Sequence, residues 1–160
     1  MLLEGTKNKT MADIKSTEER SRNMAAIKGK NTKPEVYLRK LLFARGFRYR
    51  MNSSKVPGHP DIWLRKYNTA IYVNGCFWHR HAGCKFAYMP KSRIEFWRTK
   101  FERNVLRDQE VKRRLEADGI KCVVIWECSI KKMAKQDDYR DECICRIEKF
   151  FFSESMYEEI

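Results

Sequence analysis

The segment from Ile120 to Cys128, IKCVVIWEC, constrains the fold of this chain more than any other segment. It is almost wholly apolar, and a strand of this composition has no side that favours water, so both of its faces have to be covered. We therefore predict a central, buried strand. The chain has 160 residues, which is enough for one sheet with helices packed on its faces. A single α/β domain is the simplest fold that meets these conditions.

Three pairs of polar residues at the spacing of a capping box predict the starts of helices. In a capping box, a Ser or Thr side chain and a Glu side chain three residues later each bond a free backbone N–H group. The pairs are Ser16 with Glu19, Thr32 with Glu35, and Ser92 with Glu95. Glycines mark the ends, so the predicted helices cover residues 16–28, 32–45 and 92–118. A fourth apolar stripe at helical spacing predicts a helix over 138–152.

Segments rich in β-branched and aromatic residues predict strands between the second and third helices. They cover residues 47–50, 61–67 and 69–75, and the last two are expected to form a hairpin. Residues 1–15 are polar and unpatterned, and a second possible start lies at Met11. We expect a weakly ordered tail over 1–15 and a folded domain over 16–155.

The charge of the chain favours a polyanionic partner. Lys and Arg number 34 against 21 Asp and Glu, which gives a formal net charge of +13. Such a field attracts nucleic acid or an anionic membrane. No apolar run approaches the roughly 20 residues needed to cross a bilayer, and no signal peptide is recognisable. We therefore expect a cytoplasmic, nucleoid-associated protein that binds nucleic acid, and we expect its six cysteines to be buried or metal-bound thiols.

The most specific local motif is Cys76-x4-His81-x2-Cys84. Two thiols and an imidazole within nine residues wrap one ion, and a fourth ligand would complete a tetrahedral zinc site. By residue type, the fourth ligand could be Cys122, Cys128 or one of the pair Cys143 and Cys145. Cys128 is the best candidate because it ends the predicted buried strand, where it could meet the loop. Such a site has no open coordination position, so the predicted role of Zn²⁺ is structural.

A second site is indicated by Pro60-Asp61, at the mouth of a predicted strand. A carboxylate there suits Mg²⁺, which prefers oxygen ligands and bridges to phosphate. With the helix carrying Glu35 before it, the order of elements resembles the core of restriction endonucleases. In that core the next strand carries an acid-x-Lys triplet, whereas this chain has Ile71-Tyr72-Val73. Either this site is inactive, or the chain uses a different catalytic group.

His79 is the predicted catalytic group. It lies inside the metal loop, but His81 already provides the imidazole ligand. A free imidazole beside a metal-held phosphate acts as a general acid or base near neutral pH. Asp108, on the long predicted helix, could orient the ring through its second nitrogen.

These motifs together resemble the very short patch repair endonuclease family. The matching segments are PGHPD (57–61), NGCFWHRH (74–81) with Cys84, EFW (95–97), the Asn-x-x-Arg-Asp stretch (104–108) and VIWEC (124–128). The resemblance runs from about Ser16 to Cys128. It implies a restriction-endonuclease-like fold with a central mixed sheet flanked by helices, a structural Zn²⁺, and Mg²⁺-dependent nicking of duplex DNA 5′ to the mismatched T of a T:G pair.

The resemblance also implies roles for individual residues. Asp61 and the backbone carbonyl of Val73 would hold Mg²⁺, His79 would be the catalytic imidazole oriented by Asp108, and Glu35 would contribute through water. The implied zinc ligands are Cys76, His81, Cys84 and Cys128. The implied contacts to unstacked DNA are an aromatic wedge of Phe77, Trp78 and Trp97, with Met24 entering from the opposite groove. The chain departs from the family at Asn74, where some members have histidine, and by one added residue at Ala82-Gly83.

Two alternatives stay open from the sequence. One is a related nicking or restriction-type endonuclease with another recognition site. The other is a non-catalytic, zinc-containing DNA-binding module, although an acidic cluster at Asp61 and Glu35 would only repel phosphate in a pure binding protein. We expect a monomer.

Overall fold

The structure is a computed structural model that describes residues 16–160. The predicted tail at 1–15 lies outside the described residues. The sheet has four strands in the order β1-β2-β3-β4. The strands are β1 (Ile62–Leu64), β2 (Thr69–Asn74), β3 (Lys121–Trp126) and β4 (Tyr157–Glu159). β1 is antiparallel to β2, and β2, β3 and β4 are parallel. The predicted hairpin and mixed sheet are confirmed.

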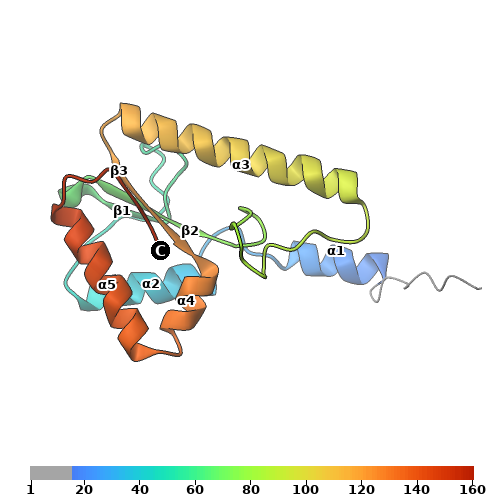
Figure 1. Cartoon of the computed structure of the whole chain (residues 1–160), viewed down its shortest axis with the longest axis horizontal. Coiled ribbons are helices and arrows are strands. Elements are labelled where there is room, and N and C mark those ends of the chain that lie inside the picture. The colour runs from blue at the N-terminus through green and yellow to red at the C-terminus, as the bar shows by residue number, and fades with distance from the viewer. Residues whose placement is uncertain (1–15) are drawn as a thin grey trace, which may run out of the picture.

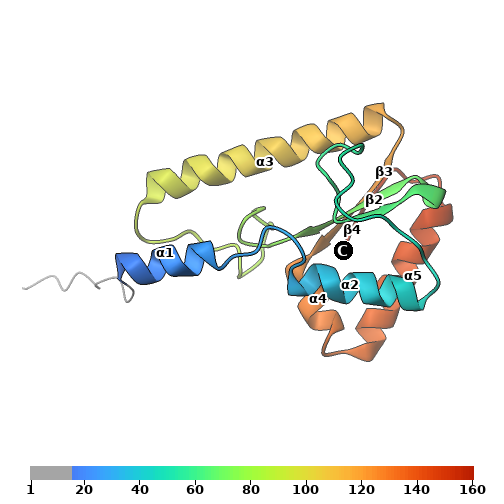
Figure 2. The ribbon, with the colours of Figure 1, turned by 180° about the vertical axis from the view of Figure 1, so that it is seen from behind.

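Helices cover both faces of this sheet (Figures 1 and 2). The long helix α3 (Ile94–Ala117) crosses one face, and α2 (Lys33–Ala44), α4 (Glu127–Met133) and α5 (Asp137–Phe152) lie on the other. A single 3-10 turn, η1 (Arg65–Tyr67), connects β1 to β2 within the described residues. α3 is the crossover between the parallel strands β2 and β3, so its amino-terminal end projects beyond the carboxyl ends of these strands.

Side chains alternate between the two faces of the sheet along β2 and β3, so the hydrophobic core has a part on each face. Ile71 and Val123 belong to the cluster formed with α2 and α5. Their neighbours Ala70 and Cys122 belong to the cluster beneath α3. Because successive side chains of a strand point to opposite faces, an apolar strand between two helical layers can bury residues on both faces, and four of the six residues of β3 are buried. β3 pairs with β2 on one side and β4 on the other, which confirms the predicted central strand.

Several expected elements differ in detail. The capping box at Ser16 and Glu19 forms with both hydrogen bonds, but the one expected at Ser92 and Glu95 does not. α3 begins after Arg93, which has a left-handed backbone (φ 53°), and Glu95 instead pairs with Arg98. The strand expected at 47–50 is reduced to one bridge between Arg50 and Trp63. The sequence did not predict α4 or β4.

The first helix, α1 (Thr17–Ala25), stands apart from the body of the protein (Figure 1). Its side chains are exposed wherever the structure describes them. It ends three residues earlier than the expected boundary at Lys28. None of the helices among residues 16–160 is long and apolar enough to cross a membrane.

Candidate metal centre and active site

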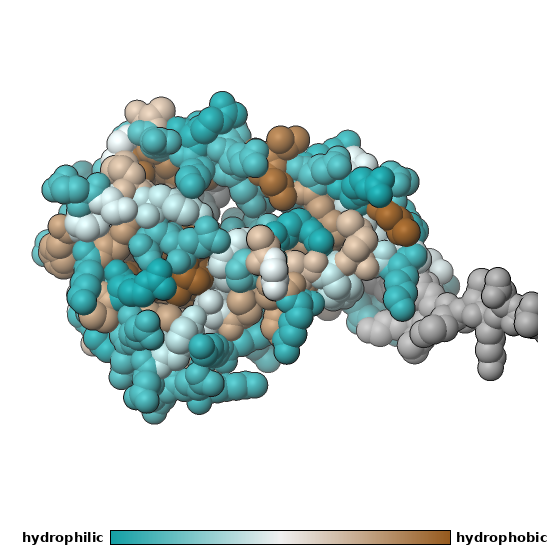
Figure 3. All heavy atoms as spheres, in the orientation of Figure 1, coloured by the Kyte–Doolittle hydropathy of each residue, from teal (hydrophilic) through white to brown (hydrophobic). Residues whose placement is uncertain are grey.

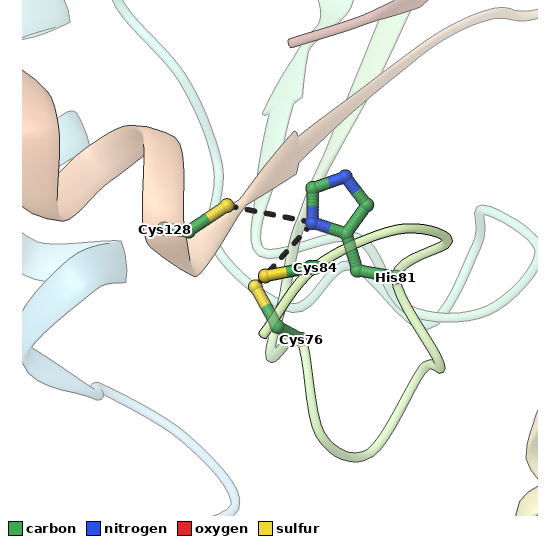
Figure 4. A group of neighbouring side chains, drawn as sticks. All are labelled: Cys76, His81, Cys84 and Cys128. Carbon is green, nitrogen blue, oxygen red and sulfur yellow. Dashed lines mark hydrogen bonds between the residues drawn. The ribbon is translucent and has the colours of Figure 1, made fainter. Parts of the chain in front are cut away.

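Four of the predicted metal ligands come together at the carboxyl end of the sheet. Their ligand atoms all lie within 4.8 Å of one another, and the residues are Cys76, His81, Cys84 and Cys128. Figure 4 shows the side chains converging, with Cys128 reaching the loop from the start of α4. We expected Cys128 to end the buried strand. It lies instead in the first turn of α4, a helix that the sequence did not predict.

The spacing of these atoms suits a tetrahedral zinc ion. Nδ1 of His81 lies 3.4 Å from Sγ of Cys128 and 3.6 Å from Sγ of Cys76. Zinc bonds of about 2.3 Å to sulfur and 2.0–2.1 Å to nitrogen give a tetrahedral sulfur–nitrogen edge of about 3.6 Å. The donor set and its geometry therefore fit a closed, four-coordinate metal centre.

The thiols of this cluster differ in their surroundings. Burial raises the pKa of the Cys76 thiol to about 12, so an unassisted thiolate is disfavoured there. Backbone N–H groups, that of Phe86 above all, lower the pKa of the Cys84 thiol. A cation bound among the sulfurs would favour all three thiolates, which is the usual coupling between metal binding and deprotonation.

The second candidate site lies at the mouth of β1. Asp61 is partly buried, and its Oδ2 accepts a hydrogen bond of 2.7 Å from the backbone N–H of Val73 on β2. Burial raises the pKa of the Asp61 carboxyl to about 6, against the opposing effect of the Val73 N–H group. The turn before it packs tightly under α3, because a Cβ on Gly58 (φ +72°) would lie 2.7 Å from Val111. Asp61 is thereby held at the junction of β1, β2 and α3.

Glu35, on α2, lines the same cleft as Asp61, and both of its carboxylate oxygens accept hydrogen bonds within the protein. Oε1 accepts from the hydroxyl of Thr32 at 2.7 Å, and Oε2 accepts from the backbone N–H of Asn31 at 2.9 Å. Oε2 also pairs with Arg39 at 3.0 Å. The expected capping box therefore does not form, since the Thr32 side chain makes no capping bond to the backbone. The negative charge of Glu35 contributes to the raised pKa of Asp61.

The predicted pair of His79 and Asp108 is brought together by the fold. Nδ1 of His79 lies 2.5 Å from Oδ2 of Asp108, and the side chains are 20% and 33% exposed. The His79 backbone is held by a turn in which its N–H donates to the Gly75 carbonyl. Asp108 reaches it from α3, which passes over the loop. With Nδ1 engaged, Nε2 is the ring nitrogen left for proton transfer.

The three predicted wedge residues form one aromatic cluster beside this pair. Phe77 contacts the rings of Trp78, Trp97 and the buried Phe101, with centroids 5.0–5.4 Å apart. Trp78 is partly exposed, and the Lys100 ammonium lies 5.0 Å from its ring centroid. Phe77 is thus the centre of the cluster, and Trp78 is the member of the three that lines the adjoining cleft. Met24, on the separate helix α1, is 41% exposed.

A cleft of about 1360 Å³ extends past Asp61, the His79–Asp108 pair and Trp78. Asp61, His79 and Asp108 line it, together with basic side chains from the α1–α2 connection, the first residue of α2, and α3. The basic side chains are Lys28, Lys30, Lys33, Lys100, Arg107 and Lys112. The space-filling view shows a largely hydrophilic surface with a hollow beneath α3 (Figure 3). A cleft with basic walls around a few carboxylates suits a polyanion that is cleaved at one point.

Sequence reasoning missed the residues that support the two sites. Arg39 is buried behind Asp61 and Glu35. Its spacing of four from Glu35 on a predicted helix was a usable signal. Trp126 stacks on His81 and donates its indole N–H to Glu159 at 2.7 Å. No local pattern pointed to Glu159, because β4 itself was not predicted.

Comparison with known proteins identifies the class. The family model described as DNA mismatch endonuclease Vsr matches residues 12–85. The chain is 46% identical over 124 residues to the Type II nicking enzyme V.NmeAIP of Neisseria meningitidis, covering 78% of this chain and 88% of the relative. It is 37% identical over 128 residues to the DNA mismatch endonuclease Vsr of Escherichia coli K12, covering 80% and 81%. A third relative, the Type II nicking enzyme V.XorIIP of Xanthomonas oryzae, is 39% identical over 77% and 90% of the two chains.

This extent of identity defines a DNA nicking endonuclease. Within that class, the chain belongs to the Vsr DNA mismatch endonuclease family. The alternative of a non-catalytic DNA-binding module is therefore set aside. The resemblance drawn from the sequence motifs is confirmed, as is the α/β fold.

Proposed function

We propose that this enzyme nicks one strand of duplex DNA 5′ to the mismatched T of a T:G pair, with Mg²⁺ as the catalytic ion. The observation that carries the proposal is the meeting of Asp61 with the His79–Asp108 pair in one basic cleft. The mismatch specificity is supported by the family and by the accessible aromatic surface beside that pair. A wobble pair costs less to unstack than a Watson–Crick pair, so aromatic side chains select it partly through deformability.

Asp61 and the backbone carbonyl of Val73 are the proposed ligands of Mg²⁺. The site offers oxygen donors and a carboxylate held by the Val73 N–H group, which matches the preference of this ion. When bound there, Mg²⁺ would polarise a phosphoryl oxygen and lower the pKa of a coordinated water. Glu35 is proposed to act through water from the far side of Asp61.

His79 is proposed to transfer the proton at the scissile phosphate through Nε2. Asp108 holds the opposite nitrogen at 2.5 Å and stabilises the imidazolium when it forms. The closed cluster of Cys76, His81, Cys84 and Cys128 is proposed to hold Zn²⁺ as a structural ion. It anchors the loop from which His79 and Trp78 project.

Phe77, Trp78 and Trp97 are proposed to replace base stacking beside the mismatch, at about 1–3 kcal/mol per base. Met24 is proposed to enter the opposite groove from α1. The enzyme is proposed to act as a monomer, since one chain provides all of these groups.

A second candidate is a nicking enzyme with another recognition site, because two of the relatives described above carry the name Type II nicking enzyme. A nicking assay separates the two. Duplexes with T:G, other single mismatches and perfect pairing, in varied flanking sequence, are incubated with Mg²⁺ or without it. Nicking confined to T:G duplexes supports the proposal, and equal nicking of a perfectly paired site refutes it. Asp61→Asn, run in parallel, is expected to bind T:G duplex without nicking it.

A further inference from the structure

A buried arginine lies directly behind the proposed magnesium site. Arg39, on α2, is 5% exposed, and its guanidinium group donates four hydrogen bonds to three residues. Nη1 donates to Oδ1 of Asn31 at 2.7 Å, and Nη2 donates to Oε2 of Glu35 at 3.0 Å. Nε and Nη2 both donate to the backbone carbonyl of Asp61, at 3.3 and 3.2 Å. The planar fork of one guanidinium thus connects the segment between α1 and α2, α2 itself and the residue that precedes β1.

This hydrogen-bond network differs from an ordinary ion pair in a protein core in where the partners of Arg39 lie. Asn31, Glu35 and Asp61 all line the cleft, whereas Arg39 itself does not. Burying an ion pair costs several kcal/mol of desolvation, and an apolar pair of the same volume is often as stable. An arginine whose hydrogen-bond partners are all residues that line the cleft is therefore poorly explained by stability alone.

The network also completes the fixation of Asp61. The carbonyl of Pro60 accepts from the Asn52 N–H, the Asp61 carbonyl accepts from Arg39, and the Asp61 carboxylate accepts from the Val73 N–H. Backbone and side chain are thus held from three directions. The other charge of the pair, Glu35, has both oxygens tied, so it keeps a fixed place beside Asp61.

We propose that Arg39 is a positioning residue of the catalytic centre, which fixes the backbone of Asp61 and the carboxylate of Glu35 in the arrangement that receives the divalent cation. The inference rests on the proposed role of Asp61 as a ligand of Mg²⁺. Arg39 touches neither DNA nor the ion in this role. Its effect is on how well the oxygen ligands are placed before the ion arrives, and groups that orient ligands in this way typically change metal affinity by about 10–100-fold.

Two substitutions distinguish position from charge. Arg39→Gln removes the charge and the fork, whereas Arg39→Lys keeps the charge but has one nitrogen in place of three spread around a plane. If placement is the function, both variants raise the Mg²⁺ concentration for half-maximal nicking by about tenfold or more. If Arg39 only balances charge, Arg39→Lys behaves as the parent, and the proposal is overturned.

Two further variants test the same proposal, one with a smaller expected effect and one as a matched control. Asn31 has a left-handed backbone (φ 55°), so Asn31→Gly keeps the loop conformation and the N–H to Glu35 while it removes one acceptor of Arg39. It should shift Mg²⁺ dependence in the same direction by a smaller factor. Arg45→Gln is the control, because Arg45 pairs with Glu148 and Asp141 at the exposed end of α2 and does not line the cleft. It should leave Mg²⁺ dependence unchanged.

The binding of Mg²⁺ is also measured without catalysis, from the rise in unfolding temperature of the DNA-free protein over a Mg²⁺ series. The Arg39 variants should need about tenfold more Mg²⁺ for the same rise. A lower unfolding temperature with parental Mg²⁺ dependence would make Arg39 purely structural and refute the proposal. Asp61→Asn is the reference variant. If it nicks DNA as the parent does, the proposed metal site is refuted. If it is inactive while Arg39→Gln shows parental Mg²⁺ dependence, only the proposed role of Arg39 is refuted.

Discussion

The imidazole of His81 lies flat against the indole of Trp126, with ring centroids 4.1 Å apart and planes within 1° of parallel. The indole is in turn held by its hydrogen bond to Glu159, which also accepts from the Tyr157 hydroxyl at 2.8 Å. The ring orientation of a proposed zinc ligand is therefore set by the last strand of the sheet, far from it in sequence.

Weakening this support should loosen the metal centre. Trp126→Leu removes the flat surface under His81, and we expect metal release to a chelator to become about 10–100-fold easier, as for other groups that orient metal ligands. Trp126→Phe keeps an aromatic face but loses the N–H to Glu159, so its effect should be smaller. Release is followed with a chromogenic chelator. Equal retention in both variants and the parent would show that the stacking has no such role.

Removing a metal ligand should cost folding stability. Cys128→Ala is expected to lose one equivalent of Zn²⁺ and several kcal/mol of stability, because metal binding and folding share free energy. For a domain of this size, each kcal/mol corresponds to about 2–4 °C in unfolding temperature. Elemental analysis and thermal unfolding measure both. Cys145→Ala is the control, since Cys145 is exposed and outside the cluster. A folded, active parent without zinc would contradict the assignment.

The Asp61 carboxyl should make stability depend on pH when no Mg²⁺ is added. Burial raises its pKa from 3.8 to about 6, so the ionised form is disfavoured in the folded protein. The stability that the group contributes is present below about pH 4 and is lost as pH rises through about 6. Asp61→Asn should therefore be more stable than the parent above about pH 7, by at most about 3 kcal/mol, and converge with it in acid. Thermal unfolding over a pH series measures this, and a difference that grows toward low pH would have the wrong sign.

Loss of His79, the proposed catalytic imidazole, should lower turnover without weakening DNA binding. His79→Ala is expected to reduce single-turnover nicking by about 10²–10⁴-fold, the range for losing a general acid or base. Asp108→Asn should have a smaller effect, because it disturbs only the orientation of the ring. Added free imidazole should partly restore His79→Ala. Unchanged nicking by His79→Ala would remove this residue from the chemistry.

Within the aromatic cluster, we expect some side chains to contribute mainly to DNA binding and others mainly to folding stability. Trp78→Ala should weaken binding to T:G duplex by about 1–3 kcal/mol, with less effect on perfect duplex, which is held through phosphate contacts. Its effect on stability should be smaller than that of a core substitution, because Trp78 is only partly buried. Phe101→Ala, at the buried side, should instead cost about 3–5 kcal/mol of stability. Equal melting of both variants would identify Trp78 as a core residue.

Local chemistry was enough to predict much of this protein. The capping box at Ser16, the hairpin of β1 and β2, and the burial of β3 each depend on residues that are neighbours in sequence. The spacing of Cys76, His81 and Cys84 likewise specifies a metal loop without any knowledge of the fold. Net charge and the motifs around Asp61 and His79 indicated a nuclease.

What only the tertiary structure decided depends on contacts between distant segments. The residue types left three sources for the fourth metal ligand, and the fold selects Cys128. Cys122 and Cys143 face the two cores, and Cys145 is exposed and outside the cluster. Thr32 and Glu35 have the spacing of a capping box, but Arg39 and Asn31 draw the Glu35 carboxylate into another network. β4 is three residues long and, within residues 16–160, pairs with β3 alone, so its formation depends on a sheet edge that is built from distant segments. These outcomes depend on which side chains and strands compete for the same hydrogen-bond and packing partners. Such partners come together only on folding, so a local sequence pattern does not contain this information.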